Sequence, residues 1–271
     1  SGENLRLRAL SALLALSMLA GTQALAAAPD ISKLALPPGF EIEVVTTKVP
    51  NARQMALSDS GVLYVGTRRA GNVYAVTGAL SATPTDPQVR VRTIASGLTM
   101  PSGLAWHNGS LYVGALNEIL RFDNIDNKLD LPGDPVLITG DLPDKKHHGW
   151  KYLNVGPDNA LYVPVGAPCN ICKSKDTRFA SILRMDPANG KTSLYAEGVR
   201  NTVGMAWHPD SKELYFTDNG RDMLGDDVPE EEVIESALRV STSATRIFTP
   251  EKFQTPSLAK AGEPMNSNLR C

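Results

Sequence analysis

One short pattern occurs four times along the chain and limits the folds that are open to it. Each copy is a turn rich in Gly, Asn, Asp or Pro, followed by an apolar run that contains a Leu-Tyr pair. The four runs are Val62–Gly66, Leu111–Gly114, Leu161–Gly166 and Leu214–Thr217. Their tyrosines stand at positions 64, 112, 162 and 215, so the spacings are 48, 50 and 53 residues. Because Gly, Asn and Asp tolerate the positive φ angles of hairpin turns, each copy predicts a turn that leads into a β-strand.

Further strand patterns accompany the copies at similar offsets. The apolar segments before and after the runs are Gln54–Leu57, Gly103–Trp106, Gly204–Trp207, Val73–Val76, Ile119–Phe122 and Ile182–Met185. Glu41–Val45 and Val89–Ile94 alternate apolar and polar residues, which is typical of half-buried strands. About four short strands in each repeat of roughly 50 residues indicate the blades of a β-propeller. A β-sandwich with coincidental spacing is the alternative.

The repeats occupy residues 35–233 and amount to about four blades, whereas propellers typically have four to eight. We therefore predict an all-β fold, a β-propeller of which this chain contains only part. Residues 234–271 show no repeat of turn and strand, and we expect them to be irregular or weakly helical.

The first 28 residues have the pattern of a secretory signal peptide. Arg6 and Arg8 precede an apolar stretch, Ala9–Ala20, and Ala24–Ala26 offers small residues for cleavage. Twelve apolar residues would span only about 18 Å as a helix, which is too short for a hydrocarbon core of roughly 30 Å. We expect an exported protein, periplasmic or secreted, with no membrane span once the signal is removed.

The charge balance argues against a nucleic-acid partner. The 271 residues are 21% charged with a formal net charge of −2, and no basic stripe stands out along the sequence.

Three polar segments contain residues suited to chemistry. His147 and His148 precede a predicted strand, and in an extended segment they would face opposite ways, so that only one could act as a base. They could equally be a pair of surface histidines. Arg200-Asn201 offers donors for a carboxylate or carbonyl, or a simple surface ion pair. Asp218–Asp222, with Asp226 and Asp227 further on, suits Ca²⁺ or is a solvated acidic loop.

Cys169 and Cys172 form a C-x-x-C that lacks the histidine of a haem-attachment site. In an exported chain a local disulfide is the leading interpretation, ahead of a free thiol pair and of redox catalysis.

Several longer motifs, in this order, resemble the glucose/sorbosone dehydrogenase family. They are His147–Lys151, Gly156–Asp158, Leu161–Cys172, Gly198–Gly204, Trp207–Pro209 and Thr217–Asp222. The resemblance covers roughly residues 35–233, and it is strongest to the exported, sorbosone-dehydrogenase-like branch. These enzymes use pyrroloquinoline quinone (PQQ), and soluble glucose dehydrogenase is the best-described kind.

The resemblance implies a six-bladed propeller with PQQ and Ca²⁺ on its axis, of which this chain would be an N-terminal fragment. It implies that His148 is the catalytic base and that Arg200, Asn201 and Asn219 bind the cofactor. It also implies that the backbone carbonyls of Gly220 and Arg221 hold the Ca²⁺. The sequence departs from the family at Tyr152, where the family has an arginine.

The activity expected from the resemblance is the oxidation of a sugar or aldose by hydride transfer to PQQ. The partners would be a small sugar and an external electron acceptor, and a fragment would be weakly active or inactive. The alternatives are a propeller that binds a ligand without catalysis and a Ca²⁺-dependent, lactonase-like hydrolase.

Overall fold

A computed structural model describes residues 30–80, 89–172, 174–225 and 231–236. The predicted signal peptide and residues 237–271 of the predicted tail lie outside these ranges. The described chain is almost entirely β, with two short 3₁₀ turns, η1 (Ile31–Lys33) and η2 (Ile125–Asn127). None of its helices is long and apolar enough to cross a membrane.

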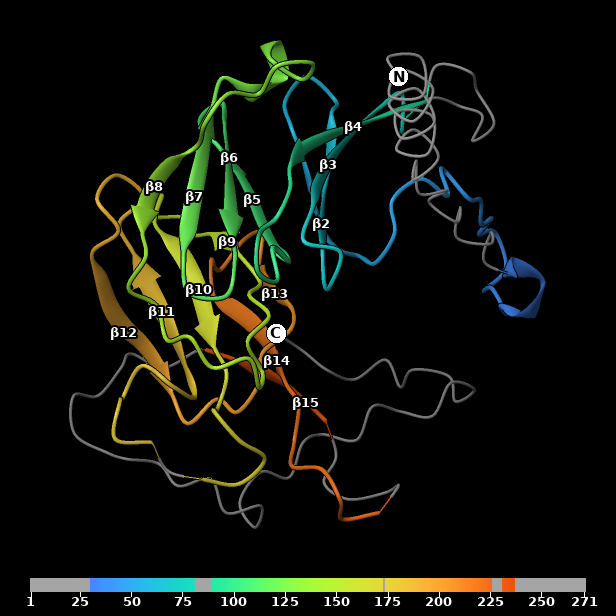
Figure 1. Ribbon diagram of the computed structural model, residues 1–271. Coiled ribbons are helices and arrows are strands. Elements are labelled where there is room, and N and C mark those ends of the chain that lie inside the picture. Colours follow the sequence, from blue (N-terminus) through green and yellow to red (C-terminus); the bar gives the residue numbers. More distant parts are fainter. Residues whose placement is uncertain (1–29, 81–88, 173, 226–230, 237–271) are drawn as a thin grey trace, which may run out of the picture.

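The strands form four separate antiparallel sheets, each built from strands that follow one another along the chain (Figure 1). The first sheet contains β1 (Ala52–Leu57), β2 (Leu63–Thr67), β3 (Val73–Thr77) and β4 (Arg90–Ala95), and the second contains β5 (Gly103–His107), β6 (Ser110–Gly114), β7 (Ile119–Asp123) and β8 (Val136–Thr139). The third contains β9 (Asn154–Val155), β10 (Leu161–Val165), β11 (Ser181–Met185) and β12 (Thr192–Glu197), and the fourth contains β13 (Met205–Trp207), β14 (Leu214–Asp218) and β15 (Glu232–Glu235).

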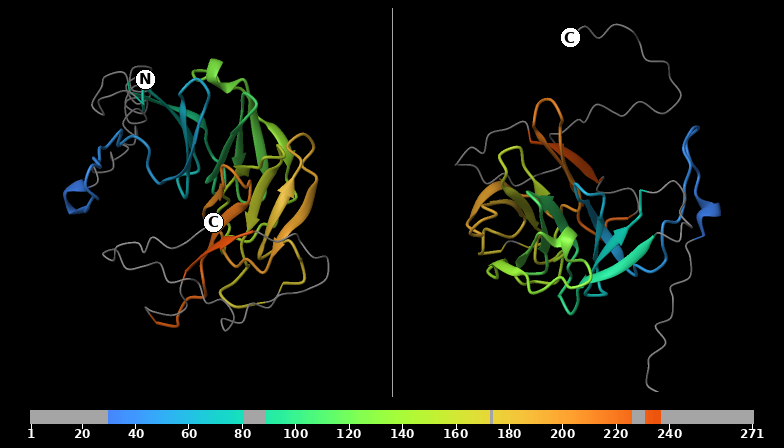
Figure 2. Two further views of the ribbon diagram at one scale, coloured as in Figure 1. Left: turned by 180° about the vertical axis from the view of Figure 1, so that it is seen from behind. Right: turned by 90° about the horizontal axis from the view of Figure 1, so that it is seen from above.

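The predicted fold class, a β-propeller with about four blades in this chain, is confirmed. The four repeated Leu-Tyr runs are β2, β6, β10 and β14, the second strand of each sheet. The sheets are arranged one after another about an axis, as the view from above shows (Figure 2). β15 begins at Glu232, so strand structure continues past the boundary predicted at residue 233.

The strand predicted at Glu41–Val45 is wrong, because the segment pairs with no sheet. Val45 and Val49 instead pack on the face of the first sheet, against Val65, Tyr74 and Val76. Ile42 is 38% exposed, so only part of the apolar surface of this segment is covered. The alternation that suggested a strand has no neighbouring strand to pair with.

Side chains from neighbouring strand positions pack against different sheets. On β6, Leu111 and Val113 belong to the cluster shared with the first sheet, whereas Tyr112 belongs to the cluster shared with the third. β10 repeats this arrangement, because Leu161 and Val163 face the second sheet and Tyr162 faces the fourth. Alternate residues of one strand thus provide the apolar side chains on both faces of a blade.

The repeated tyrosines of β2, β6 and β10 point toward the sheet that follows. Tyr64 stacks on Trp106 of the second sheet with ring centroids 5.8 Å apart. Tyr162 meets Trp207 of the fourth sheet edge to face at 4.8 Å. On β14, Leu214 and Phe216 pack against the third sheet. Tyr215 stands between them, and alternation directs it to the opposite face of the fourth sheet.

The side chain of Gln54 on β1 joins three sheets near the axis. Its Oε1 accepts hydrogen bonds from the backbone N–H of Leu104 (2.9 Å) and of Leu153 (3.0 Å), and its Nε2 donates to the Leu153 carbonyl (2.7 Å). Asn154 continues the connection by donating to the Met205 carbonyl of the fourth sheet at 2.8 Å. Side-chain amides thus take up backbone groups on the inner edges of the sheets, where strands pair on one side only.

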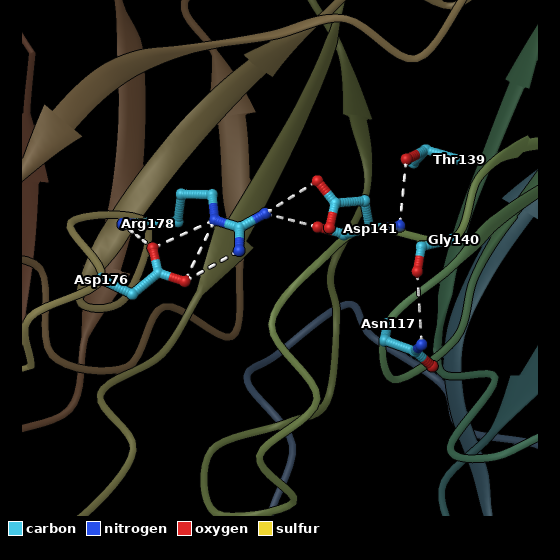
Figure 3. A network of polar contacts seen from close by, with 6 residues as sticks. All are labelled: Asn117, Thr139, Gly140, Asp141, Asp176 and Arg178. Atoms are coloured by element: carbon cyan, nitrogen blue, oxygen red, sulfur yellow. Dashed lines mark hydrogen bonds and ion pairs between the residues drawn. The ribbon is translucent and has the colours of Figure 1, made fainter.

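A second tie joins the second and third sheets farther out. Figure 3 shows Arg178, in the loop ahead of β11, between Asp176 of its own loop and Asp141, which follows β8. Because the Arg178 side chain is 35% exposed, the ion pair between Arg178 and Asp141 adds at most about 1 kcal/mol to the free energy of unfolding.

We predict that Gln54→Leu lowers the free energy of unfolding by about 3 kcal/mol. The change leaves two N–H groups and one carbonyl of nearly fully buried residues without partners, at roughly 1–3 kcal/mol each before relaxation. Chemical denaturation measures the loss. Met55→Leu on the same strand is the control, because Met55 is 59% exposed and its replacement should change stability by less than about 0.5 kcal/mol.

Candidate functional site

His148 lies at the ends of the strands of the third sheet, half-buried beside the end of β10. Its Nδ1 lies 2.9 Å from the carbonyl oxygen of Ala167. Since a carbonyl only accepts, Nδ1 carries the proton and Nε2 is left with a free lone pair. Burial lowers the pKa of His148, and the nearby Arg200 and His147 lower it further, against the hydrogen bond to Ala167. The ring is therefore neutral at pH 7 and can accept a proton.

The backbone at His148 is unusual. Its φ is +49°, in the left-handed region, which a non-glycine residue adopts at some cost. The rings of His147 and His148 lie 4.0 Å apart, edge to face. The expectation that an extended backbone sends the two rings to opposite sides is therefore wrong, because the chain turns at this point. His147 is exposed and His148 is half-buried.

Gly166 makes room for His148. A Cβ at Gly166 would lie 2.5 Å from the Cβ of His148 and 3.3 Å from the Arg200 carbonyl oxygen. The backbone N–H of Ala167 donates to that same carbonyl at 2.8 Å. The end of β10 thus holds His148 and Arg200 on either side of one short stretch of backbone.

Arg200 is bound mainly by other protein groups. Its Nε donates to the Asn170 carbonyl (3.1 Å) and its Nη1 to the Asn219 carbonyl (2.9 Å). Its Nη2 donates to Asn170 Oδ1 and to Asp222 Oδ2, both at 2.8 Å. Four of the five N–H groups of the guanidinium are therefore used, and one on Nη1 remains for a ligand.

Asn201 and Asn219 are brought to the same end of the fourth sheet. The N–H of Asn219 donates to the Asn201 carbonyl at 3.2 Å. Asp218 fixes this loop by accepting from the backbone N–H of Arg200 (3.0 Å) and of Asn201 (2.7 Å). Burial raises the pKa of Asp218, although the two N–H donors oppose the shift. The neighbouring Thr202 is 2% exposed, and its hydroxyl has no partner in the described structure.

Gly220 and Arg221 follow Asn219 in a segment without regular secondary structure. The Gly220 N–H donates to the Glu231 carboxylate at 3.1 Å. Among the described residues no donor bonds the carbonyls of Gly220 and Arg221, and no group of three His, Cys, Asp or Glu side chains could hold a metal. Asp226 and Asp227 lie outside the described residues.

The loop after β10 contains a disulfide between Cys169 and Cys172. Asn170, between them, contacts both Arg200 and Asp222: its Oδ1 accepts from the Asp222 N–H at 2.9 Å, and its Nδ2 donates to the Asp222 carbonyl at 3.2 Å. Sequence reasoning missed Asn170, since only its place between two cysteines distinguishes it there.

Lys151 is a second residue that the sequence did not single out. It is 3% exposed, and its Nζ donates to the Gly149 carbonyl at 3.2 Å. Burial lowers its pKa from 10.5 to about 8. Gly103 and Gly114 of the second sheet make space for it, because a Cβ at either would lie 3.1 Å from the Lys151 Cβ.

Comparison with known proteins gives the following likenesses. An uncharacterized protein of Borreliella burgdorferi is 28% identical over 219 residues, which cover 77% of this chain and 55% of that protein. No family model matches the chain. The chain thus spans a little over half the length of this relative.

Three solved structures resemble the chain. An AA12-family carbohydrate-active enzyme from Trichoderma reesei has a TM-score of 0.60 at 20% identity and covers 74% of this chain and 55% of its own. The PQQ domain of a pyranose dehydrogenase from Coprinopsis cinerea has a TM-score of 0.55 at 16% identity, with coverages of 69% and 48%. The PQQ-bound aldose sugar dehydrogenase from Streptomyces coelicolor has a TM-score of 0.51 at 21% identity, with coverages of 67% and 60%.

These likenesses show the fold. The chain has a β-propeller fold, and the solved structures with a similar fold include PQQ-dependent sugar dehydrogenases. It spans about half the length of the pyranose dehydrogenase domain.

We predict that Asn170→Ala accelerates backbone hydrogen exchange at Asp222 by about tenfold or more, because it removes the acceptor of that N–H. The N–H of Arg200, which bonds to Asp218, should exchange as before. Hydrogen exchange read by mass spectrometry or NMR separates the two sites. Ile171→Ala, at a residue that is 62% exposed in the same loop, is the control. An unchanged Asp222 rate would mean that Asn170 does not hold this loop.

We predict that the free energy of unfolding rises between about pH 8 and 10.5 by roughly 3 kcal/mol because of Lys151. In this window the unfolded chain keeps the proton on Lys151 and the folded chain has lost it, so the unfolded state binds more protons and stability increases with pH. Below pH 8 both states are protonated and the cost of the buried charge is present in full.

Lys151→Met should remove this part of the pH dependence, and Lys145→Met, at an exposed lysine nearby, should leave it intact. Urea denaturation across the pH range measures the difference between each variant and the wild type. Parallel curves for the wild type and Lys151→Met would contradict the depressed pKa.

Proposed function

We propose that this chain is part of an exported PQQ-dependent sugar dehydrogenase. It contributes the part of the active site that contains the catalytic base, His148. The observation that supports the proposal is the meeting of His148, Arg200, Asn201 and Asn219 at one end of the third and fourth sheets. These residues come from segments up to 71 positions apart (219 − 148), and they meet at the ends of β10 and β14.

The polar groups left over at this end suit a quinone and a cation. The hydroxyl of buried Thr202 has no partner among the described groups, and one Nη1 hydrogen of Arg200 is unused. The carbonyls of Gly220 and Arg221 are oxygen ligands of the kind that Ca²⁺ takes. We infer that Arg200, Asn201 and Asn219 would hold PQQ, and that the backbone carbonyls of Gly220 and Arg221 would hold Ca²⁺. PQQ, when bound, supplies the acceptor for a hydride.

His148 is suited to remove the proton of a sugar hydroxyl. Its Nε2 lone pair is available because Nδ1–H is committed to Ala167, and its lowered pKa keeps it unprotonated at neutral pH. The Ala167 hydrogen bond and the close approach of Gly166 fix the ring orientation. Arg200 is itself held by Asn170 and Asp222, so its remaining donor is fixed before any ligand arrives.

In a complete version of the protein, we predict that His148→Ala lowers kcat for sugar oxidation by on the order of 10²–10⁴, with PQQ still bound. His147→Ala, the neighbouring exposed residue, should lower it much less. Sugar-dependent dye reduction is measured in protein loaded with PQQ and Ca²⁺, and PQQ binding is measured separately by absorbance. A larger loss with His147→Ala would mean that the base is misassigned, and ester hydrolysis without dye reduction would favour a lactonase-like hydrolase.

A further inference from the structure

A cavity of about 310 Å³ lies near the axis, apart from the residues of the site proposed above. It is lined by Arg53, Gln54, Trp150, Lys151, Tyr152 and Val203. These residues come from β1, from the segment ahead of β9 and from the segment ahead of β13, so three sheets contribute to its wall. Its volume lies near the lower end of the range for small-molecule sites, roughly 300–1,000 Å³.

Positive charge gathers around this cavity without a counter-charge. Arg53 and Lys151 line it, and the guanidinium of Arg68 lies 3.2 Å from the centroid of the Trp150 ring. Burial lowers the pKa of Arg68, and so do the neighbouring Arg53 and Arg69. The lining contains no carboxylate, and none of the ion pairs in the described part of the chain involves any of these four cations.

Several donors around the cavity lack acceptors. The ammonium of Lys151 has three hydrogens and bonds to one carbonyl, that of Gly149. The indole N–H of Trp150 and the Nε of Arg68 are buried, and neither has a hydrogen-bond partner in the described structure. Buried donors and charges are costly unless they are paired. These two donors, together with the Lys151 ammonium and its single partner, therefore indicate a ligand that accepts hydrogen bonds and carries negative charge.

The rest of the wall indicates what the anion is attached to. Trp150, Tyr152 and Val203 present aromatic and aliphatic surface, which a bare inorganic anion would not use. The fork of an arginine matches the planar geometry of a carboxylate. We propose that this cavity binds a small organic acid, whose carboxylate is held by Lys151 and Arg53 and whose carbon chain lies against Trp150. The proposal does not rest on the dehydrogenase function.

Calorimetric titration of the 271-residue chain with gluconate, at low ionic strength, tests this site. We expect saturable binding to the wild type, and binding at least about tenfold weaker to Lys151→Met and to Arg53→Gln. Lys145→Met, at an exposed lysine, is the matched control and should bind as the wild type does. Glucose, which has the same carbon chain without a carboxylate, should not bind at this site.

Thermal unfolding without ligand separates a binding role from a structural one. Because the Lys151 charge is buried and unpaired, Lys151→Met should be at least as stable as the wild type while losing the stabilisation by gluconate. Arg53 is exposed, so Arg53→Gln keeps the test valid if Lys151→Met fails to fold. The proposal is wrong if gluconate does not bind the wild type, if phosphate binds more tightly than gluconate, or if PQQ alone binds in a manner that depends on Lys151.

Discussion

The arrangement of the sheets depends on how the backbone near the axis is satisfied. The inner strand of each sheet pairs on one side only, and β9 has only two residues, so strand pairing alone leaves N–H and C=O groups of buried residues unmatched. Gln54 supplies both an acceptor and a donor to Leu104 and Leu153, and Asn154 supplies a donor to Met205. A buried backbone group without a partner costs more than one hydrogen bond gains. Gln54 therefore connects the first sheet to the second and third, and Asn154 connects the third sheet to the fourth.

The number of hydrogen-bond donors that have acceptors also distinguishes the two polar regions of the molecule, around Arg200 and around Lys151. Arg200 would be free to face a ligand if it stood alone, but Asn170, Asn219 and Asp222 take up most of its hydrogen-bonding capacity. The guanidinium therefore acts chiefly as a connector between the disulfide loop and the loop after β14. Around Lys151 the opposite holds, since cations and N–H groups there exceed the acceptors that surround them.

Much of the fold could be predicted from sequence because it depends on local regularities. The Leu-Tyr runs and their turns identify β2, β6, β10 and β14, since strand alternation and turn chemistry are both visible in neighbouring residues. The strand predicted at Glu41–Val45 is wrong because alternation alone does not show that a segment has a neighbouring strand to pair with. His148, Arg200 and Asn201 could be named from a resemblance, but Asn170, Gln54 and Lys151 could not. Their roles come from contacts across as many as 99 positions, which no local pattern encodes.

Because the repeated tyrosines point from one sheet to the next, the sheets form a linear array in which each contacts its neighbours. Each of the first three sheets buries Tyr64, Tyr112 or Tyr162 against the next, so stability depends on contacts between neighbouring sheets and not on a single shared core. The second and third sheets are covered on both faces, whereas the fourth presents Tyr215 on a face that no described sheet covers. Among the described sheets the second and third are therefore held most firmly, and the disulfide loop after β10 depends on them.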